Sequence, residues 1–442
     1  MSIKLSDHFT YRRLLKFTFP SIIMMMFMSI YGIIDGLFVS NFVGPDEFTA
    51  LNFIYPMLMV LSSFGFMFGS GGNALISKIY GEGNKKKANE VFSLVVYTSV
   101  IIGIIISIIG LYTIKPIAIL LGAKGLLLEN CIIYAVPLII SIPFFMLQLE
   151  FQTFFNTAEI PTIGLICTIC AGVLNVILDA ILILVFKLGI LGASIATVMS
   201  QVVGGLFPVI YFMSKNKSIL RLGKTKFDIK ALLKTVTNGS SELLSNVSMS
   251  LVGLLYNVQL LKYEGEPGVT AYGIMMYISL LLNAIFIGFS LGTAPIVGYN
   301  FGAKNHAELK GLLRKCICII SVFSVITFIL SQSLKGVFAG VFVGYDEHLY
   351  NLTKNGFVIY SFSFLFIGLA IYFSSFFTAL NDGLTSAIIS FLRTLVFQII
   401  FVIVLPLFMG VNGIWLSIVL AEMSAVVVSL IFLFVKRRKY NY

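Results

Sequence analysis

Six charged residues lie inside long apolar stretches of this 442-residue chain, where charge is costly. Five are acids and one is a base: Asp35, Glu150, Asp179, Glu242, Glu422 and Arg393. A charged side chain at the centre of a bilayer costs at least about 2.5 kcal/mol, so each of these residues needs a partner or a function. They are therefore the first candidates for chemistry.

Asp35 and Asp179 are the most informative of these acids. Asn175 precedes Asp179 by four residues, so both lie on one face of a helix, and Thr197 adds an oxygen at comparable depth in the next apolar stretch. We expect Asp35 and Asp179 at one level in the outer half of the membrane. Two carboxylates, an amide and a hydroxyl suit a shared proton or a hard cation such as Na⁺. The alternative for Asp35 is an interfacial residue that reaches headgroup water.

A second polar group lies on the stretch near residues 231–262. Asn238, Glu242 and Asn246 follow one another at four-residue spacing, which predicts a polar stripe on one helical face that is directed into a lumen.

The remaining charged candidates have two interpretations each. Glu150, between Gln148 and Gln152, either lines an inner vestibule or is an interfacial acid whose side chain extends to water. Arg393 and Glu422 occur at similar depth in adjacent stretches, which indicates a structural ion pair or a position near an interface between the two halves of the chain.

Composition identifies the environment of these residues. The chain has 58% hydrophobic and 11% charged residues, whereas soluble domains carry about 25% charged residues. Helices of about 20 residues cross the roughly 30 Å hydrocarbon layer. Twelve stretches are long and apolar enough to do so, near residues 13–40, 50–78, 90–113, 127–156, 162–186, 191–214, 231–262, 268–299, 309–333, 350–380, 385–408 and 412–435. We predict an all-α membrane protein with twelve spans.

The two halves of the chain are repeats. Residues 44–84 align without a gap with residues 265–305, at an offset of 221, which is half of 442. Glycines recur in register, as do the loop asparagines: Gly44 and Gly265, Gly71 and Gly292, Gly81 and Gly302, Asn84 and Asn305. Six spans in each half predict two parallel lobes, 1–214 and 231–442, joined by the basic linker 215–230. Such internal repeats are typical of secondary transporters.

The positive charge predicts the orientation. If the N-terminus is cytoplasmic, all but six of the 30 Lys and Arg residues lie on the cytoplasmic side; the six are Lys115, Lys124, Lys187, Lys262, Lys335 and Lys354. This bias predicts that both termini and the linker are cytoplasmic. The net charge of +11 therefore reflects membrane topology, and we expect no nucleic-acid partner.

The motifs of several enzyme and metal-binding classes are absent from the sequence. It has no phosphate-binding Gly-x-x-x-x-Gly-Lys-Ser/Thr, no His-Glu-x-x-His and no nucleophile elbow. The five cysteines lie within or at the ends of apolar stretches, and the three histidines lie in loops or tails. We therefore predict neither an enzyme nor a bound cofactor.

Several of these features resemble the multidrug and toxic compound extrusion (MATE) family, most closely its MepA-like and DinF-like bacterial branches. They are Asp35 before an outer Gly44-Pro45 loop, Asn175-x-x-x-Asp179, the run Gly189-Ile-Leu-Gly192-Ala-Ser-Ile-Ala-Thr197, and the duplicated lobes. The resemblance covers essentially the whole chain. It implies a MATE/MOP-type fold and a bacterial plasma-membrane antiporter that exports amphipathic, mostly cationic small molecules by alternating access. Inward movement of H⁺ or Na⁺ would drive the export, and we expect a monomer.

The resemblance also implies roles for single residues. The cation ligands of the family match Asp35, Asn175, Asp179 and Thr197, and Pro20 matches the bend position of the first helix. Glu242 resembles the acid of the C-terminal lobe.

The chain departs from one branch of the family in the tenth span, because no acid occurs between Tyr350 and Leu380 to partner Glu242. Substrate attraction and closure between the lobes both remain open as roles for Glu242. Two other functions are considered: a lipid-linked oligosaccharide flippase of the same superfamily, and a non-transporting scaffold. A flippase would be expected to carry a cationic cluster, whereas the buried charges here are mostly acids.

Overall fold

The computed structural model describes residues 3–216, 218–344 and 346–442, so Lys217 of the predicted linker lies outside the described residues. Eleven of the described helical segments are long and apolar enough to cross a membrane, and a bent pair brings the number to twelve. The prediction of twelve spans is confirmed. The helices of the first half are α1 (Tyr11–Phe38), α2 (Pro45–Gly81), α3 (Lys85–Leu120), α4 (Gly125–Ile140), α5 (Ile142–Thr157), α6 (Pro161–Asp179) and α7 (Gly189–Met213), with π-helices η1 (Val39–Val43) and η2 (Ala180–Val185).

The second half repeats this order with more interruptions. Its elements are α8 (Ile229–Tyr263), α9 (Glu266–Gly302), α10 (His306–Val343), α11 (Glu347–Tyr360), the 3₁₀ turn η3 (Ser361–Ser363), α12 (Phe364–Ala379), α13 (Gly383–Phe391), the π-helix η4 (Leu392–Val396), α14 (Phe397–Val404), α15 (Pro406–Met409) and α16 (Val411–Tyr440). Helices α11 and α12 together form one span, and α13 to α15 form another.

The fourth span is not one straight helix, as the stretch 127–156 predicted, but two helices bent by 60°. The break lies at Ser141, and Pro143 stands in the first turn of α5. Proline has no N–H to donate to the preceding turn, and its ring collides with the carbonyl of that turn. The Ser141 hydroxyl donates to Gln201 of α7 at 2.5 Å, which fixes the bend against a neighbouring helix.

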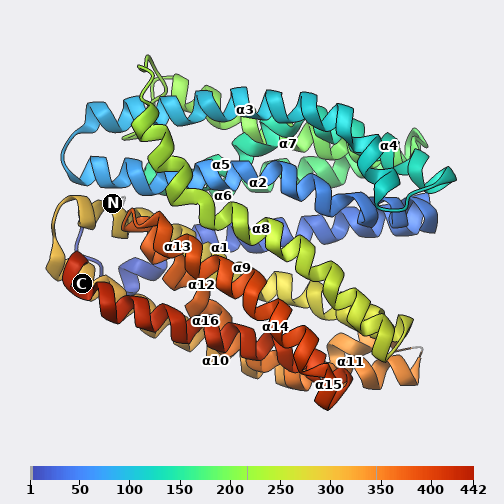
Figure 1. Cartoon of the computed structure of the whole chain (residues 1–442). Helices are drawn as coiled ribbons and strands as arrows, with labels where there is room; N and C mark the ends of the chain where they lie inside the picture. Colours follow the sequence, from blue (N-terminus) through green and yellow to red (C-terminus); the bar gives the residue numbers. More distant parts are fainter. Residues whose placement is uncertain (1–2, 217, 345) are drawn as a thin grey trace.

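Two hydrophobic cores divide the molecule, one for each half of the chain. Two helices cross this division: α1 packs on α9, and α8 packs on α2, more extensively than any other helix pairs. Phe17 and Ile22 of α1 accordingly belong to the core of the C-terminal half. Figure 1 shows the two groups of helices one above the other, with α8 running between them.

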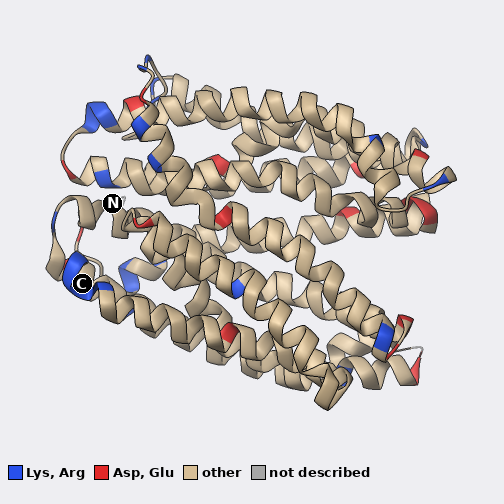
Figure 2. Ribbon diagram, viewed as in Figure 1, with Lys and Arg blue, Asp and Glu red and all other residues tan. Residues whose placement is uncertain are grey.

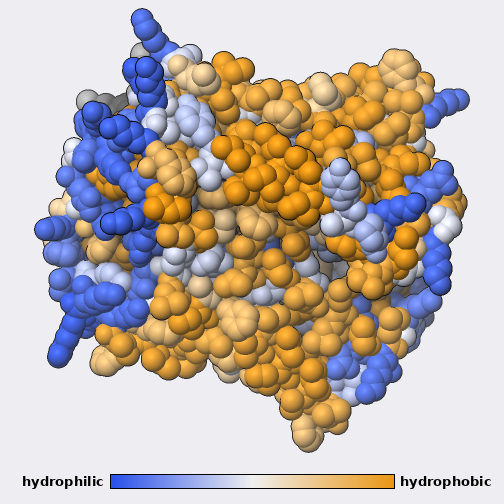
Figure 3. Space-filling view, turned by 45° about the horizontal axis from the view of Figure 1, so that its top comes forward, coloured by the Kyte–Doolittle hydropathy of each residue, from blue (hydrophilic) through white to orange (hydrophobic). Residues whose placement is uncertain are grey.

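Charge separates the two ends of the molecule from its middle. Lys and Arg gather at the end that holds both termini, which is called the basic end below (Figure 2). The surface between the two ends is largely hydrophobic (Figure 3). A wide apolar belt between polar ends is what a bilayer requires of a helical bundle.

Close backbone contacts join the halves near the basic end. Gly81 of α2 meets the carbonyl of Tyr299 in α9, and Gly302 of α9 meets the carbonyl of Lys78 in α2. Lys78 and Tyr299 are themselves 221 positions apart, so the contact obeys the repeat. A Cβ atom on either glycine would collide with backbone. Small residues let membrane helices approach this closely, and the two halves are therefore tightly closed at the basic end.

Arg393 and Glu422 form an ion pair inside the C-terminal half. The Nε of Arg393, in η4, donates to both carboxylate oxygens of Glu422 in α16, at 2.8 and 3.1 Å. The side chains are only 15% and 6% exposed. Each residue thus neutralises the other within the apolar belt, as the structural-pair interpretation proposed.

We predict that both termini and the linker lie on the cytoplasmic side. A single cysteine at Lys224 or Asn441, which are both exposed, should react with a membrane-impermeant maleimide in inside-out vesicles and stay unreactive in intact cells. Labelling of Lys224→Cys from outside the cell would overturn the orientation and the parallel arrangement of the lobes.

We further predict that Glu422→Gln destabilises the protein because Arg393 is left charged and unpaired. Breaking a buried pair costs about 3–5 kcal/mol, whereas replacing both partners by apolar residues is often neutral. Glu422→Gln should lower the thermal unfolding midpoint in detergent. The double variant Arg393→Met with Glu422→Leu should have a midpoint close to that of the unmodified protein. Glu129→Gln, at an exposed acid, is the control. If the unfolding midpoint of the double variant falls as far as that of Glu422→Gln, an unpaired Arg393 is not the cause of the loss of stability.

Candidate functional site

Asp35 and Asp179 come together in the N-terminal half. Asp35 lies on α1 one turn before the π-helix η1, and Asp179 is the last residue of α6, directly before the π-helix η2. Asp179 is fully buried and Asp35 is partly buried. Their carboxyl groups lie close enough for each to act on the charge of the other. The structure thus brings together the two acids that the sequence placed at one depth, and π-helical turns of this kind often occur at functional sites.

Asn175 and Thr197 complete an all-oxygen cluster. Asn175 lies one turn before Asp179 on α6 and is buried; its Nδ2 donates to the hydroxyl of Thr197 in α7 at 3.4 Å. In the described part of the chain, no donor satisfies the Asn175 Oδ1, either oxygen of Asp179, or the Oδ1 of Asp35.

This arrangement requires a positive charge between the carboxylates. Two carboxylate oxygens repel each other unless a proton or a cation lies between them. Within the described ranges, neither Asp35 nor Asp179 forms an ion pair with a Lys, Arg or His side chain. The cluster is therefore suited to take up one proton or one hard cation.

Three tyrosines surround the acid pair, and sequence reasoning did not identify them. Tyr31 of α1, Tyr55 of α2 and Tyr134 of α4 each lie close enough to Asp35 to interact with its charge. Tyr31 precedes Asp35 by one helical turn, which was the one available signal. The other two come from distant helices, so only the fold shows their proximity.

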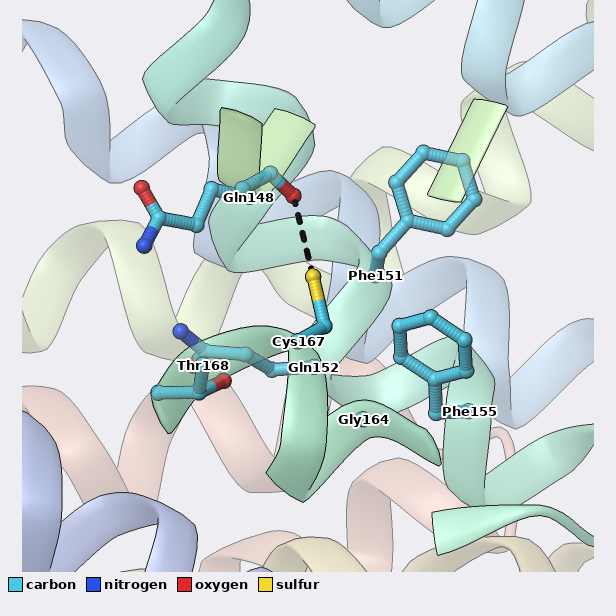
Figure 4. A pocket seen from close by; sticks show the side chains of 8 residues that line it. Gln148, Phe151, Gln152, Phe155, Gly164, Cys167 and Thr168 are labelled. Atoms are coloured by element: carbon cyan, nitrogen blue, oxygen red, sulfur yellow. Dashed lines mark hydrogen bonds between the residues drawn. The ribbon is translucent and has the colours of Figure 1, made fainter. Parts of the chain in front are cut away.

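Gln148 and Gln152 lie on one face of α5, next to α6 and α7. They border a cavity of about 10 Å³ together with Phe151, Phe155 and Thr168 (Figure 4). Both glutamines are more than nine-tenths buried. A cavity of this size has room for about one water molecule. In this conformation the two residues face the interior of the N-terminal half and not an open lumen.

Glu150 does not occupy either position that the sequence suggested. It is fully buried, so it neither lines a vestibule nor reaches water at the membrane surface. It lies beside Ser99 of α3, and its backbone packs on Gly69 of α2. It follows Gln148 by two positions, which corresponds to about 200° around a helix and places it on the other side of α5.

The predicted stripe on α8 divides into two environments. Glu242 and Asn246 are partly exposed, and Asn246 Nδ2 donates to the backbone carbonyl of Glu242 at 2.8 Å. Asn238 is fully buried instead of facing a lumen. Its Nδ2 donates to Asn381 Oδ1 at 2.8 Å, and Asn381 Nδ2 donates to the carbonyl of Ala74 in α2, also at 2.8 Å. Asn238 is therefore part of the closed contact between the halves.

Pro20 lies within α1, and the helix continues through it from Tyr11 to Phe38. Proline leaves the carbonyl of the preceding turn without its helical N–H partner, which makes this position a place where a helix bends easily. Its neighbours Thr18 and Ser21 contact glycines of α9 in the other half. The predicted bend position therefore coincides with the contact between α1 and the C-terminal half.

Comparison with known families explains the repeat. A family model described as MatE matches residues 20–181 and again residues 243–404, which together are more than half of the chain. One model that matches twice shows that the two halves are copies of one domain.

Curated relatives cover nearly the whole chain. The multidrug export protein MepA of Staphylococcus saprophyticus is 28% identical over 434 residues, which span 97% of this chain and 94% of the relative. MepA of Staphylococcus haemolyticus is also 28% identical, over 93% of this chain and 90% of its own length. The flippase alternative gains no support from these similarities.

Solved structures share the fold. An outward-facing multidrug resistance MATE transporter of the MOP superfamily superposes with a TM-score of 0.92 at 22% identity, over 98% of this chain and 97% of that one. A MATE structure in a bent conformation gives a TM-score of 0.90 at 22% identity, over 99% and 97% of the two chains. By its two family matches, its MepA-like relatives and its fold, the chain belongs to the MatE family of transporters.

Proposed function

We propose that this chain is a cation-coupled antiporter that exports amphipathic, mostly cationic small molecules from the bacterial cytoplasm. The observation that carries the proposal is the oxygen cluster of Asp35, Asn175, Asp179 and Thr197, which has no basic partner in the described part of the chain. The coupling ion is H⁺ or Na⁺, since both fit an all-oxygen cluster of this kind.

Coupling requires that ion binding favour one of two conformations. Asp35 lies on α1, which contacts both α6 of its own half and α9 of the other half. Binding of an ion between Asp35 and Asp179 removes the repulsion between these two acids, which lie on the packed helices α1 and α6. The ion thus alters the position of a helix that also touches the opposite lobe, and this is the physical basis of the proposed alternating access.

The cargo class follows from charge and from the relatives. Glu242 is a partly exposed acid within a membrane helix, and Asn246 presents an amide one turn away. An apolar surface with a single acid favours amphipathic cations over anions. The curated relatives carry the name multidrug export protein, which agrees with a broad range of such compounds.

We predict that Asp35→Asn and Asp179→Asn each abolish gradient-driven export. Neutralisation removes the charge that the coupling ion must meet, but it leaves folding near normal because a buried charge is lost. In proteoliposomes, proton and sodium gradients are imposed separately, and the movement of an ethidium-like dye is recorded. Asp35→Asn with Asp179→Asn should be no worse than either single variant, as expected for residues that act as one unit.

Glu129→Gln is the matched control, because Glu129 is an exposed acid of the same half. It should export at the rate of the unmodified protein. Full gradient-driven export by either neutralised variant would remove the cluster from the mechanism. No export by the unmodified protein under either gradient would refute the antiporter itself.

We also predict that Glu242→Gln weakens the export of cations more than that of neutral or zwitterionic compounds of similar size. The carboxylate attracts positive charge, and its loss leaves the ion cluster of the other lobe intact. Competition between a cationic and a neutral dye in the same vesicles measures the ratio. An equal loss for all compounds would assign Glu242 to closure between the lobes.

A further inference from the structure

The segment before the first helix of each lobe is held by the other lobe. At the start of α8, Asp228 accepts a hydrogen bond from the Nζ of Lys87 at 2.6 Å, and Lys87 belongs to the first turn of α3 in the N-terminal half. Just before it, the hydroxyl of Thr225 donates to the carbonyl of Glu90, also in α3, at 2.7 Å. The short segment that precedes the first helix of a lobe is called its lead-in below. The lead-in to the C-terminal lobe, which includes Thr225 and Asp228, is thus attached to the N-terminal lobe.

The lead-in to α1 makes the reciprocal contact. The Nδ1 of His8 lies 2.6 Å from Glu308 Oε2, and the backbone N–H of Phe9 donates to Glu308 Oε1 at 2.9 Å. Glu308 stands in the first turn of α10, in the C-terminal half. Lys315 of the same helix donates to the carbonyl of Phe9. Leu5 and Phe9 are fully buried in the core of that half.

The two contacts are equivalent under the internal repeat. Lys87 and Glu308 are 221 positions apart, and each lies three residues after an asparagine that caps its helix. Lys87 is a base and Glu308 is an acid, and their partners are the carboxylate of Asp228 and the imidazole of His8. The same location thus makes a polar contact with different residue types in the two halves, so the attachment itself is the common feature.

Both contacts are strong enough to bias a conformation and weak enough to release. The side chains of Lys87 and Asp228 are 40% and 30% exposed, and that of His8 is 67% exposed. The hydrogen bond from Lys87 holds the pKa of Asp228 below its usual range, so this carboxylate stays charged at neutral pH. Exposed pairs contribute little stability and are screened by salt.

The lead-ins are the weaker of the two connections that would have to yield if the basic end opened. Helix α1 packs along both α6 and α9, and α8 packs along both α13 and α2. When the lobes separate there and each helix stays in its own lobe, α1 leaves α9, α8 leaves α2, and both lead-ins leave the opposite lobe. The ion pairs of the lead-ins are the solvent-exposed part of these contacts, so they can yield before the buried helix interfaces do.

We propose that the pairs Lys87–Asp228 and His8–Glu308 are two latches that hold the basic end closed and release when the lobes open toward the cytoplasm. The inference rests on the alternating access of the proposed function. It assigns the lead-ins, and not the glycine contacts between α2 and α9, as the first connections to break.

The test measures opening at the basic end without using transport. Ser77 of α2 is fully buried where α2 meets Gly298 of α9, so it is a reporter for separation of the lobes. Ser77→Cys is introduced into a full-length chain whose five native cysteines are replaced, and the rate of reaction with an impermeant maleimide is followed in inside-out vesicles. The variants are Lys87→Met, Asp228→Asn and their double. Asparagine at 228 keeps an oxygen that can cap α8.

The matched control is Lys86→Met, because Lys86 is the exposed neighbour of Lys87 and forms no ion pair within the described ranges. Lys87→Met and Asp228→Asn should each raise the labelling rate about two- to fivefold. The labelling rate of the double variant should not exceed that of either single variant. Labelling of the chain with intact latches should rise with salt toward the rate of the variants, because salt screens exposed pairs.

Unchanged labelling in both single variants, an equal rise in Lys86→Met, or additive effects in the double variant would each overturn the latch. Thermal unfolding midpoints of all variants, measured in parallel, separate a local release from a general loss of stability. Dye export by the chain with intact latches is measured separately. If the variants leave the labelling rate unchanged while the unmodified chain exports dye, this inference alone is refuted. The proposed function is tested separately by the dye assay.

Discussion

The repulsion between two carboxylates in a medium that solvates charge poorly is the interaction on which the candidate site depends. Asp35 and Asp179 lie close enough to act on each other's charge, and neither has a basic partner in the described part of the chain. In water, side chains so charged would move apart. Here α1 and α6 are held together by packing along their length, so the repulsion is relieved only when a proton or a cation binds. The packing of the helices determines the distance between the acids, and this short distance favours the binding of a proton or a cation between them.

The two lobes share a backbone arrangement, but they differ in whether their buried acids have a basic partner. In the C-terminal half, Glu422 is neutralised by Arg393 through two hydrogen bonds, so this pair has no need of an exchangeable ion. In the N-terminal half, Asp35 and Asp179 have no such partner among the described residues. Duplication therefore supplied two similar scaffolds, and the placement of Arg393 neutralises Glu422 in one of them. This asymmetry is why the proposed ion exchange is placed in the N-terminal lobe.

The sequence predicted the parts of the structure that depend on length, hydropathy and depth. All twelve spans and the convergence of Asp35 with Asp179 belong to this class, because both follow from counting residues along helices of known rise. The 60° bend of the fourth span was missed although Pro143 signals it. A proline predicts a weak point in a helix, whereas the angle depends on what packs against it.

Other errors arose where helical periodicity does not identify the neighbouring helix. Asn238 shares a face with Glu242, yet it is buried against Asn381 while Glu242 is partly exposed, because the two meet different neighbours along the length of α8. Glu150 was grouped with Gln148 by sequence proximity alone. Its two-residue spacing already indicated the opposite face of the helix, so this error was avoidable. Tyr55 and Tyr134 could be found only from the fold.

A single helix connects the candidate ion site to the closed end of the molecule. Helix α1 carries Asp35 near one end, Pro20 in its first half, and Thr18 against Gly292 of the opposite lobe. Proline at position 20 removes one backbone hydrogen bond, so the two parts of α1 are less rigidly joined there than in an unbroken helix. In the proposed mechanism, ion binding at Asp35 changes the balance of forces on the outer part of α1, while Thr18 below Pro20 contacts α9. A helix that bends at Pro20 would pass on only part of a displacement to that contact, whereas a rigid helix would pass on all of it. The position of this proline therefore determines how much of the electrostatic change at Asp35 reaches the basic end.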